Sequence, residues 1–146
     1  MLGGAPLNAV FQAHQIGLHL GGKAVMVSRI GQDELGKSLF KKIKEHGMNH
    51  TFIQQDPNAD TGTVSITLNG TEPEYEITKN VAWDKLEWNE SLSDLANRCN
   101  AVCFGTLGQR AEPAKSTIQK FIQTATKANR LFDVNLRQNY FSKDTL

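Results

Sequence analysis

Apolar residues recur along the chain with two different spacings. Helical spacing predicts helices over Leu7–Leu20, Leu35–His46, Ser91–Cys99 and from Glu112 to about Asn129. Short apolar or alternating runs predict strands at Ala24–Val27, Thr51–Gln54, Thr63–Leu68, Glu74–Thr78, Ala101–Phe104 and Leu131–Asn135. Because strands and helices alternate over most of the chain, the pattern predicts an α/β fold with a mainly parallel sheet in a single domain, residues 1–146.

The stretch from about residue 61 to residue 80 departs from this rhythm. Two alternating runs flank Asn69-Gly70, a dipeptide typical of tight β-hairpin turns. Alternation leaves one face of such a hairpin polar, and two interpretations fit it equally. The hairpin is either a lid or dimer surface, or an edge hairpin that covers one end of the core. It is the only internal boundary that the sequence indicates.

Two further expectations concern the second helix and its surroundings. Polar Ser28–Asp33 is expected to form the turn after the strand Ala24–Val27. In the helix that follows, Leu35, Leu39, Phe40 and Ile43 are expected to be buried, because they recur at helical spacing.

Near the start of the chain, Gly3-Gly4-Ala5-Pro6-Leu7-Asn8 leads into the first helix. Two glycines allow a sharp turn and a close approach to a ligand, and Pro6 suits the first helical turn. Free N–H groups at a helix N-terminus favour oxygen-rich ligands, and the Asn8 amide could donate and accept hydrogen bonds there. The pattern alone also fits a plain structural connection.

Ligands of open α/β sheets bind beyond the carboxyl ends of the strands. Alternation along Asp133-Val134-Asn135-Leu136-Arg137 places the Asp, Asn and Arg on one side. Asn135 and Arg137 could then hydrogen-bond hydroxyl or phosphate groups. In the alternative interpretation, Asp133 caps a loop and Arg137 pairs with an acidic surface residue.

Bulk composition excludes several classes of protein. Sixteen basic and fifteen acidic residues give a net charge of +1, which argues against a nucleic-acid or membrane partner bound through bulk charge. No apolar run approaches the length of about 20 residues that a membrane span needs. Two cysteines without a secretory signal fit a cytoplasmic location, and the four scattered histidines do not suggest a metal site.

Five stretches carry a resemblance to a known family, in the order that the family has them. They are Gly3–Asn8, Arg29–Gly36, Thr61–Val64, Phe104–Leu107 and Asp133–Arg137. The chain thereby resembles the ribokinase-like (PfkB-type) carbohydrate kinases. The last two stretches, together with Ala82-Trp83-Asp84, look most like the fructokinase branch.

The resemblance implies a three-layer α/β/α fold with a small β-sheet lid that closes over the sugar and often pairs between subunits, so a homodimer through the lid is a possible assembly. It also implies that Gly3, Gly4 and Asn8 hold sugar hydroxyls, with Arg110 near the same pocket.

Further along, the resemblance implies that Asn135 and Arg137 lie between the sugar and the phosphoryl donor. Ile66 and Tyr75 of the hairpin could lie over the sugar, although plain packing is an equal alternative. Solvated or capping roles are expected for two other acids, Asp33 and Asp84.

By the same resemblance, the intact enzyme would use ATP and Mg²⁺ to phosphorylate a primary hydroxyl of a sugar. The family's Gly-Ala-Gly-Asp segment, which supplies the anion hole and the catalytic base, does not occur in this sequence, so no catalytic residue is named. The family's sugar-binding aspartate is expected before Met1, and the helix that Ser142 would cap stops at Leu146.

We therefore expect a chain truncated at both ends, which holds most of a sugar site, binds ATP and Mg²⁺ poorly and is inactive alone. The alternative is a non-catalytic sugar-binding or dimerisation module. Neither the sugar nor the oligomeric state follows from the sequence.

Overall fold

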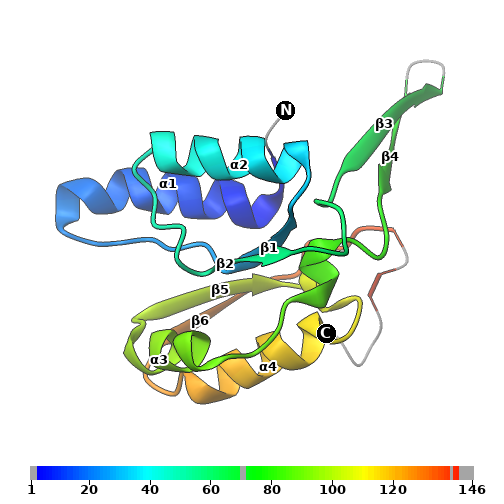
Figure 1. Cartoon of the computed structure of the whole chain (residues 1–146). Coiled ribbons are helices and arrows are strands. Elements are labelled where there is room, and N and C mark those ends of the chain that lie inside the picture. The colour runs from blue at the N-terminus through cyan, green and yellow to red at the C-terminus, as the bar shows by residue number, and fades with distance from the viewer. Residues whose placement is uncertain (1–2, 70–71, 139, 142–146) are drawn as a thin grey trace.

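The computed structural model describes residues 3–69, 72–138 and 140–141 (Figure 1). The helices are α1 (Ala5–Leu20), α2 (Glu34–Glu45), α3 (Glu90–Arg98) and α4 (Ala114–Thr124), with short 3₁₀ helices η1 (Ala82–Lys85) and η2 (Leu107–Gln109). The strands are β1 (Ser28–Gly31), β2 (Ile53–Asp56), β3 (Val64–Asn69), β4 (Glu72–Ile77), β5 (Ala101–Gly105) and β6 (Asn129–Asp133).

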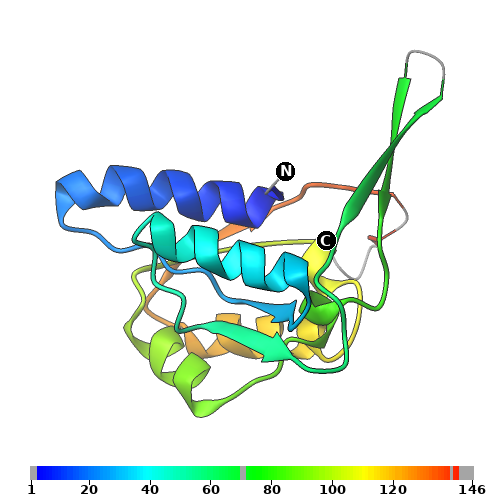
Figure 2. The same cartoon turned by 45° about the horizontal axis from the view of Figure 1, so that its top comes forward.

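The described strands pair two by two. β1 and β2 are parallel with Ser28 opposite Ile53, and β5 and β6 are parallel with Ala101 opposite Asn129. Helices α1 and α2 lie on one side of these strands and α3 and α4 on the other (Figures 1 and 2). This layering confirms the expected α/β/α class.

The remaining strands, β3 and β4, form the expected antiparallel hairpin, which projects away from the layers (Figure 2). The Gly70 half of its predicted turn lies outside the described residues, as does the short helix predicted from Ser142. No helix in the described ranges is both long enough and apolar enough to cross a membrane.

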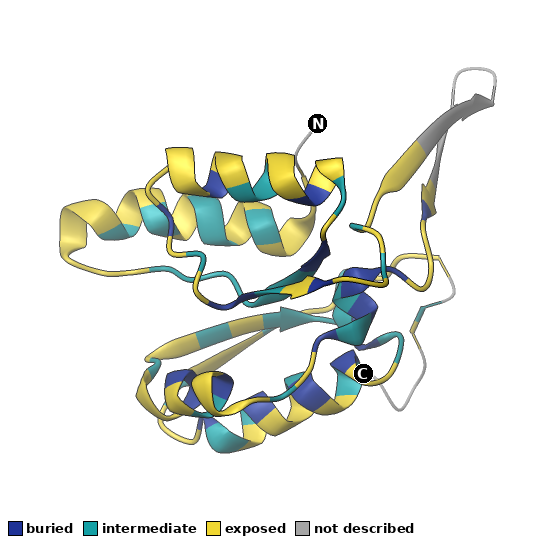
Figure 3. Cartoon of the chain, viewed as in Figure 1, coloured by how far each residue is buried: buried dark blue, intermediate teal, exposed yellow. Residues whose placement is uncertain are grey.

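Two buried clusters form the core, one for each pair of parallel strands (Figure 3). Members of the first come from β1, α2, β2 and the turn before β2: Ile30, Ile43, Met48 and Ile53. Members of the second come mainly from α3 and α4: Phe52, Leu92, Leu95, Ala96, Phe121 and Ala125. Phe52 comes from the first half of the chain but packs with the second cluster.

Three sequence-based expectations are wrong in detail. Regular pairing begins at Ser28, whereas the predicted strand Ala24–Val27 makes one isolated bridge, between Val25 and Asn49. The reason is that the residues of β2 pair with residues 28–31. Most of the predicted turn is therefore strand. Leu35 is 56% exposed, because α2 turns the faces that carry Gly36 and Ile43 toward the core.

The last helix is also shorter than predicted. It ends at Thr124, where the N–H of Thr126 bonds to the Thr124 carbonyl in a tight turn. That turn lets β6 begin at Asn129, two residues before the predicted strand.

Candidate functional site

One end of the molecule gathers the features on which the sequence analysis focused. The parallel strands run toward this end, so the segments that follow β1, β5 and β6 meet there (Figure 1). The N-terminus of α1 and the base of the hairpin lie at the same end (Figures 1 and 2). It is the end at which ligands of open α/β sheets bind.

The glycine loop enters α1 at this end. Gly4 precedes the helix with φ 110° and ψ 139°, a conformation that favours glycine, and Pro6 lies in the first turn. The carbonyl of Gly4 accepts a hydrogen bond of 3.0 Å from the Asn8 N–H. A Cβ placed on Gly3 or on Gly4 would meet no atom within 4 Å, so the loop borders open space rather than packed protein.

The segment after β6 is tied to the segment after β5. The Thr106 hydroxyl donates a 3.1 Å hydrogen bond to the carbonyl of Asn135, which holds the backbone at Asn135 in place. Asn135 is half-buried and Arg137 is exposed. Arg137 forms no salt bridge with an acidic residue in the described ranges.

Arg110, at the end of η2, lies in a buried cluster. Its Nε and Nη2 atoms donate to the two carboxylate oxygens of Asp84, each at 2.8 Å, and Nη2 also donates to the carbonyl of Thr78. The guanidinium lies 4.7 Å from the ring centre of Trp83 and 4.9 Å from that of Tyr140. Side-chain exposure is 3% for Arg110 and 7% for Asp84, so water screens this pair little.

Asp84 has a capping role but is not solvated. Its carboxylate accepts a 3.2 Å hydrogen bond from the N–H of Val81, which confirms the expected cap at the start of η1. Of the two roles expected, solvated or capping, the structure shows capping, and the Asp84 side chain is buried against Arg110.

Asp33 has the capping role that was expected. It caps α2 by accepting a 2.7 Å hydrogen bond from the Gly36 N–H, and it also accepts bonds from the backbone N–H (2.6 Å) and hydroxyl (2.8 Å) of Thr61. Burial raises the pKa of the Asp33 carboxyl, but these hydrogen bonds outweigh burial and hold the pKa below its ordinary value. The first residue of the hairpin region is thereby fastened to the N-terminus of α2.

Close packing reinforces this attachment. A Cβ on Gly36 would lie 2.0 Å from the Gly31 carbonyl oxygen and 2.8 Å from the Thr61 hydroxyl oxygen. The first turn of α2 therefore presses against the last residue of β1 and against Thr61, and only glycine fits at position 36.

A second Arg–Asp pair lies away from the hairpin. Arg29 Nε is 2.8 Å from Asp56 Oδ2, and its Nη1 is 3.0 Å from a carboxylate oxygen of the exposed Glu87. The N–H of Asn58, followed by the charge of Arg29, holds the pKa of Asp56 below its ordinary value, although burial opposes this.

The structure brings only some of the predicted site residues together. Gly3, Gly4 and Asn8 share one loop, and Asn135 and Arg137 share the segment after β6. No hydrogen bond joins these two groups within the part of the chain that the structure describes. In the hairpin, β3 and β4 pair Ile66 with Tyr75, and the side chains of both lie outside what the structure describes.

Sequence reasoning missed the partners of Arg110 and of Asp33. Nothing in the spacing links Arg110 to Asp84 or Tyr140. The one available signal was chemical, since an Arg in a turn beside a sheet end needs a carboxylate partner if it is buried. Thr61 had the weaker signal of a hydroxyl at the start of an inserted hairpin.

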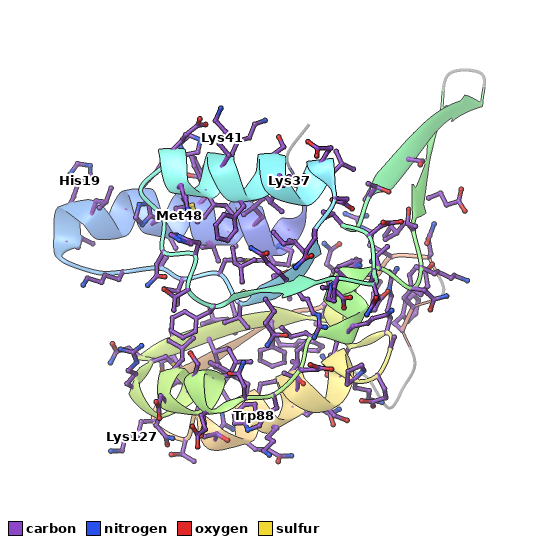
Figure 4. All side chains as sticks on the ribbon, viewed as in Figure 1. His19, Lys37, Lys41, Met48, Trp88 and Lys127 are labelled. Carbon is purple, nitrogen blue, oxygen red and sulfur yellow. The ribbon has the colours of Figure 1, made fainter. Side chains whose placement is uncertain are left out.

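A groove of about 610 Å³ runs beside α2 and reaches Gly31 and Gly36, next to Asp33. It is lined by Ile30, Phe40 and a row of lysines that includes Lys37 and Lys41, which point outward from α2 (Figure 4). None of the predicted sugar-site residues lines it, and Lys37 is already paired with Glu34 at 2.6 Å. We assign it no part in the site.

The fold and the position of the site define a class, the ribokinase-like sugar kinases, and the comparison with family models agrees. Residues 1–145 match the model described as pfkB family carbohydrate kinase. The chain belongs to the pfkB family of carbohydrate kinases.

Individual relatives point the same way. The chain is 27% identical over 136 residues to an uncharacterized sugar kinase of Pyrococcus horikoshii, covering 92% of this chain and 43% of the relative. It is 30% identical over 146 residues to a fructokinase of Solanum tuberosum, covering 97% of this chain and 44% of that one. The chain therefore spans less than half the length of these relatives.

Solved structures share the fold. The Pyrococcus horikoshii sugar kinase in complex with ATP superposes with a TM-score of 0.80 at 26% identity, covering 94% of this chain and 45% of the kinase. A fructokinase from Vibrio cholerae in its fructose-, ADP- and calcium-bound form gives 0.71 at 23% identity, covering 97% and 45%. The latter likeness concerns the fold alone.

Proposed function

We propose that this chain supplies the sugar-binding half of an ATP-dependent sugar kinase of the fructokinase type. The observation that carries the proposal is the loop at Gly3-Gly4, because it combines a glycine-requiring backbone, open space and a position at the ligand-binding end of the sheet. Membership of the pfkB family supports a sugar as the ligand.

In this proposal the backbone at Gly3 and Gly4 approaches the sugar, and the Asn8 amide exchanges hydrogen bonds with its hydroxyls. Asn135 and Arg137 lie nearer the phosphoryl donor. Arg137 is charged and exposed, so it is suited to meet an anionic phosphate as that group approaches. The hairpin closes over the sugar as a lid and could also pair with a second copy.

ATP is the proposed phosphoryl donor, with Mg²⁺ as its counter-ion. No group of three or more His, Cys, Asp or Glu residues in the described ranges is placed to hold a metal ion, so we assign no step on this chain to Mg²⁺. The catalytic base and the anion hole would come from residues outside the chain, which lacks a Gly-Ala-Gly-Asp segment. Its two free thiols fit a reducing cytosol.

The test compares the 146-residue chain with the longest in-frame gene product that contains it. We expect the longer product to release ADP from ATP in the presence of a hexose such as fructose, and the 146-residue chain to release none. ADP release by the short chain would overturn its proposed inactivity. A longer product that phosphorylates no sugar would overturn the kinase assignment.

A second candidate function is a non-catalytic sugar-binding or dimerisation module, favoured by a hairpin that projects freely from the layers. Calorimetric titration of the short chain with fructose, combined with its mass in solution, separates the two. A stable dimer that binds fructose supports the module. A monomer without affinity for fructose supports half of a kinase.

A further inference from the structure

The hairpin joins the body of the protein through two short legs, residues 61–63 and 77–79. Thr61 in the entry leg is fixed by Asp33, as described above. In the exit leg, the carbonyl of Thr78 accepts a hydrogen bond from Arg110, and that of Ile77 accepts one of 3.3 Å from the Tyr140 hydroxyl. Each leg is therefore held by side chains from outside the hairpin.

Arg110 connects the exit leg to Asp84 through two nitrogen atoms of one side chain. The N–H groups on its Nε and Nη2 are shared between the two carboxylate oxygens of Asp84 and the Thr78 carbonyl. A guanidinium is rigid and planar, so bonding both oxygens of Asp84 fixes its orientation. The position of Thr78 relative to η1 is thereby fixed as well.

Aromatic rings fix the same guanidinium from its faces. Trp83 and Tyr140 contact it at 4.7 and 4.9 Å, and Tyr140 itself bonds to the exit leg. η1, the turn after β5 and the segment after β6 therefore all meet at the exit leg through Arg110. An isolated two-stranded hairpin is only marginally stable in water, so the hairpin depends on contacts with the rest of the protein. The contacts at its legs therefore set the angle between the hairpin and the body of the protein.

We infer that Arg110 is a positioning residue, which sets the angle of the hairpin over the sugar, rather than a group that binds the sugar directly. The effect of Arg110 on sugar binding rests on the proposed kinase function. Its effect on the position of the hairpin rests on the contacts alone. Lysine keeps the charge of Arg110 but cannot hold both oxygens of Asp84 in a planar fork while bonding to Thr78, so Arg110→Lys should loosen the hairpin.

The chain offers a matched control in Arg29, which also forms a 2.8 Å pair with a buried aspartate but has no hydrogen bond or ion pair to the hairpin in the described ranges. The experiment measures amide hydrogen exchange of the 146-residue chain. We expect Arg110→Lys to speed exchange of the cross-strand amides at the hairpin base, above all the Thr78 N–H, which bonds to the Thr63 carbonyl at 3.1 Å, by about tenfold or more, since it removes charge-assisted bonds. Exchange in α3 should stay unchanged.

Arg29→Lys should leave exchange at the hairpin base unaltered. Equal acceleration there by Arg29→Lys and Arg110→Lys would overturn the inference. If Arg110→Lys does not fold, the same exchange measurement on Tyr140→Phe tests the inference instead. Tyr140→Phe removes one hydrogen bond to Ile77 and should speed exchange at the same amides by a few-fold, whereas no change would overturn the inference.

Kinetics of the longer gene product supply a readout that a merely structural role would not move. Arg110→Lys should raise KM for the sugar severalfold and leave KM for ATP unchanged, whereas Arg29→Lys should change neither. A parallel rise of both KM values would contradict the positioning role. Failure of the kinase proposal would appear separately, as no phosphorylation by the unaltered protein, and the exchange experiment would still decide the geometry.

Discussion

The two halves of this chain follow the same plan but bury their helices differently. Each half pairs two parallel strands and packs two α-helices against them. In the second half, α3 and α4 bury apolar side chains such as Leu92 and Phe121. In the first half, α1 has no fully buried residue and leaves Ile16, Leu18 and Leu20 more than half exposed. A helical pattern in the sequence therefore predicts a helix, but not how deeply the helix packs.

The two Arg–Asp pairs repeat this contrast. Arg110 and Asp84 are almost wholly buried, whereas Arg29 is more exposed and shares its charge with the exposed Glu87. Removing one partner of a buried pair leaves an uncompensated charge, and this cost falls as water gains access.

The largest effect is therefore expected from Arg110→Ala, which leaves Asp84 buried without its cation. We expect a loss of roughly 3–5 kcal/mol in the free energy of unfolding, and a clearly smaller loss for Arg29→Ala. Urea unfolding followed by circular dichroism measures both. Equal losses would mean that the two pairs are equally solvated in solution.

Leucine-to-alanine changes test the helices directly. Leu92 in α3 is 1% exposed, so Leu92→Ala should cost about 2–5 kcal/mol by removing packed methyl groups. Leu18 in α1 is 65% exposed, and Leu18→Ala should change stability by less than about 0.5 kcal/mol. A large loss from Leu18→Ala in thermal unfolding would show that α1 is covered in solution.

The pH dependence of stability compares a carboxylate in each half of the chain, Asp33 in the first and Glu112 in the second. The pKa of Asp33 is lowered in the folded state, so its ionised form stabilises the protein above the ordinary value of 3.8, and this contribution is lost as the pH falls through the lower folded value. Asp33→Ala should cost about 2 kcal/mol near pH 7, through the lost helix cap and the bonds to Thr61.

The cost of Asp33→Ala should then shrink as the pH falls below 3.8 and through the lower folded pKa, because the wild-type carboxyl becomes protonated there and its charge no longer stabilises the fold. Glu112 in the second half also has a lowered pKa, chiefly through hydrogen bonds from Ser116, but it is exposed. Glu112→Gln should change stability little at any pH. A pH-independent cost for Asp33→Ala would contradict the role of its charge.

The smallest effect is expected at the glycine loop. Both Gly3 and Gly4 border open space, but only Gly4 has a positive φ. Gly4→Ala should cost about 1 kcal/mol in stability, whereas Gly3→Ala should leave stability unchanged, and both should weaken sugar binding by crowding the loop. Calorimetric titration of the longer gene product with fructose checks the binding, and a Gly4→Ala affinity equal to that of the unaltered protein would remove Gly4 from the proposed site.

Local patterns predicted most helices and the hairpin well. The third helix was predicted at Ser91–Cys99 and lies at Glu90–Arg98, because Asn89 caps it through a local hydrogen bond to the Leu92 N–H. Such bonds connect residues a few positions apart, so a sequence pattern contains them.

Partners that are distant in sequence were not predictable. β1 lies four residues later than expected, because its position depends on β2, which pairs with it across about 25 residues. The bond between Arg110 and Asp84 spans 26 residues and depends on how η1 and η2 pack. The site residues taken from the family resemblance stay predictions.

The absence of a side chain at Gly36 has a consequence for how this sequence can diverge. A single added methyl group there would collide with the strand β1 and with the entry leg of the hairpin at once, and no neighbouring substitution can retract a backbone oxygen. Neutral drift should therefore leave position 36 almost untouched while the exposed positions of α1 vary freely. A library of random variants selected only for folding would recover glycine at 36 and many residues at 16, 18 and 20.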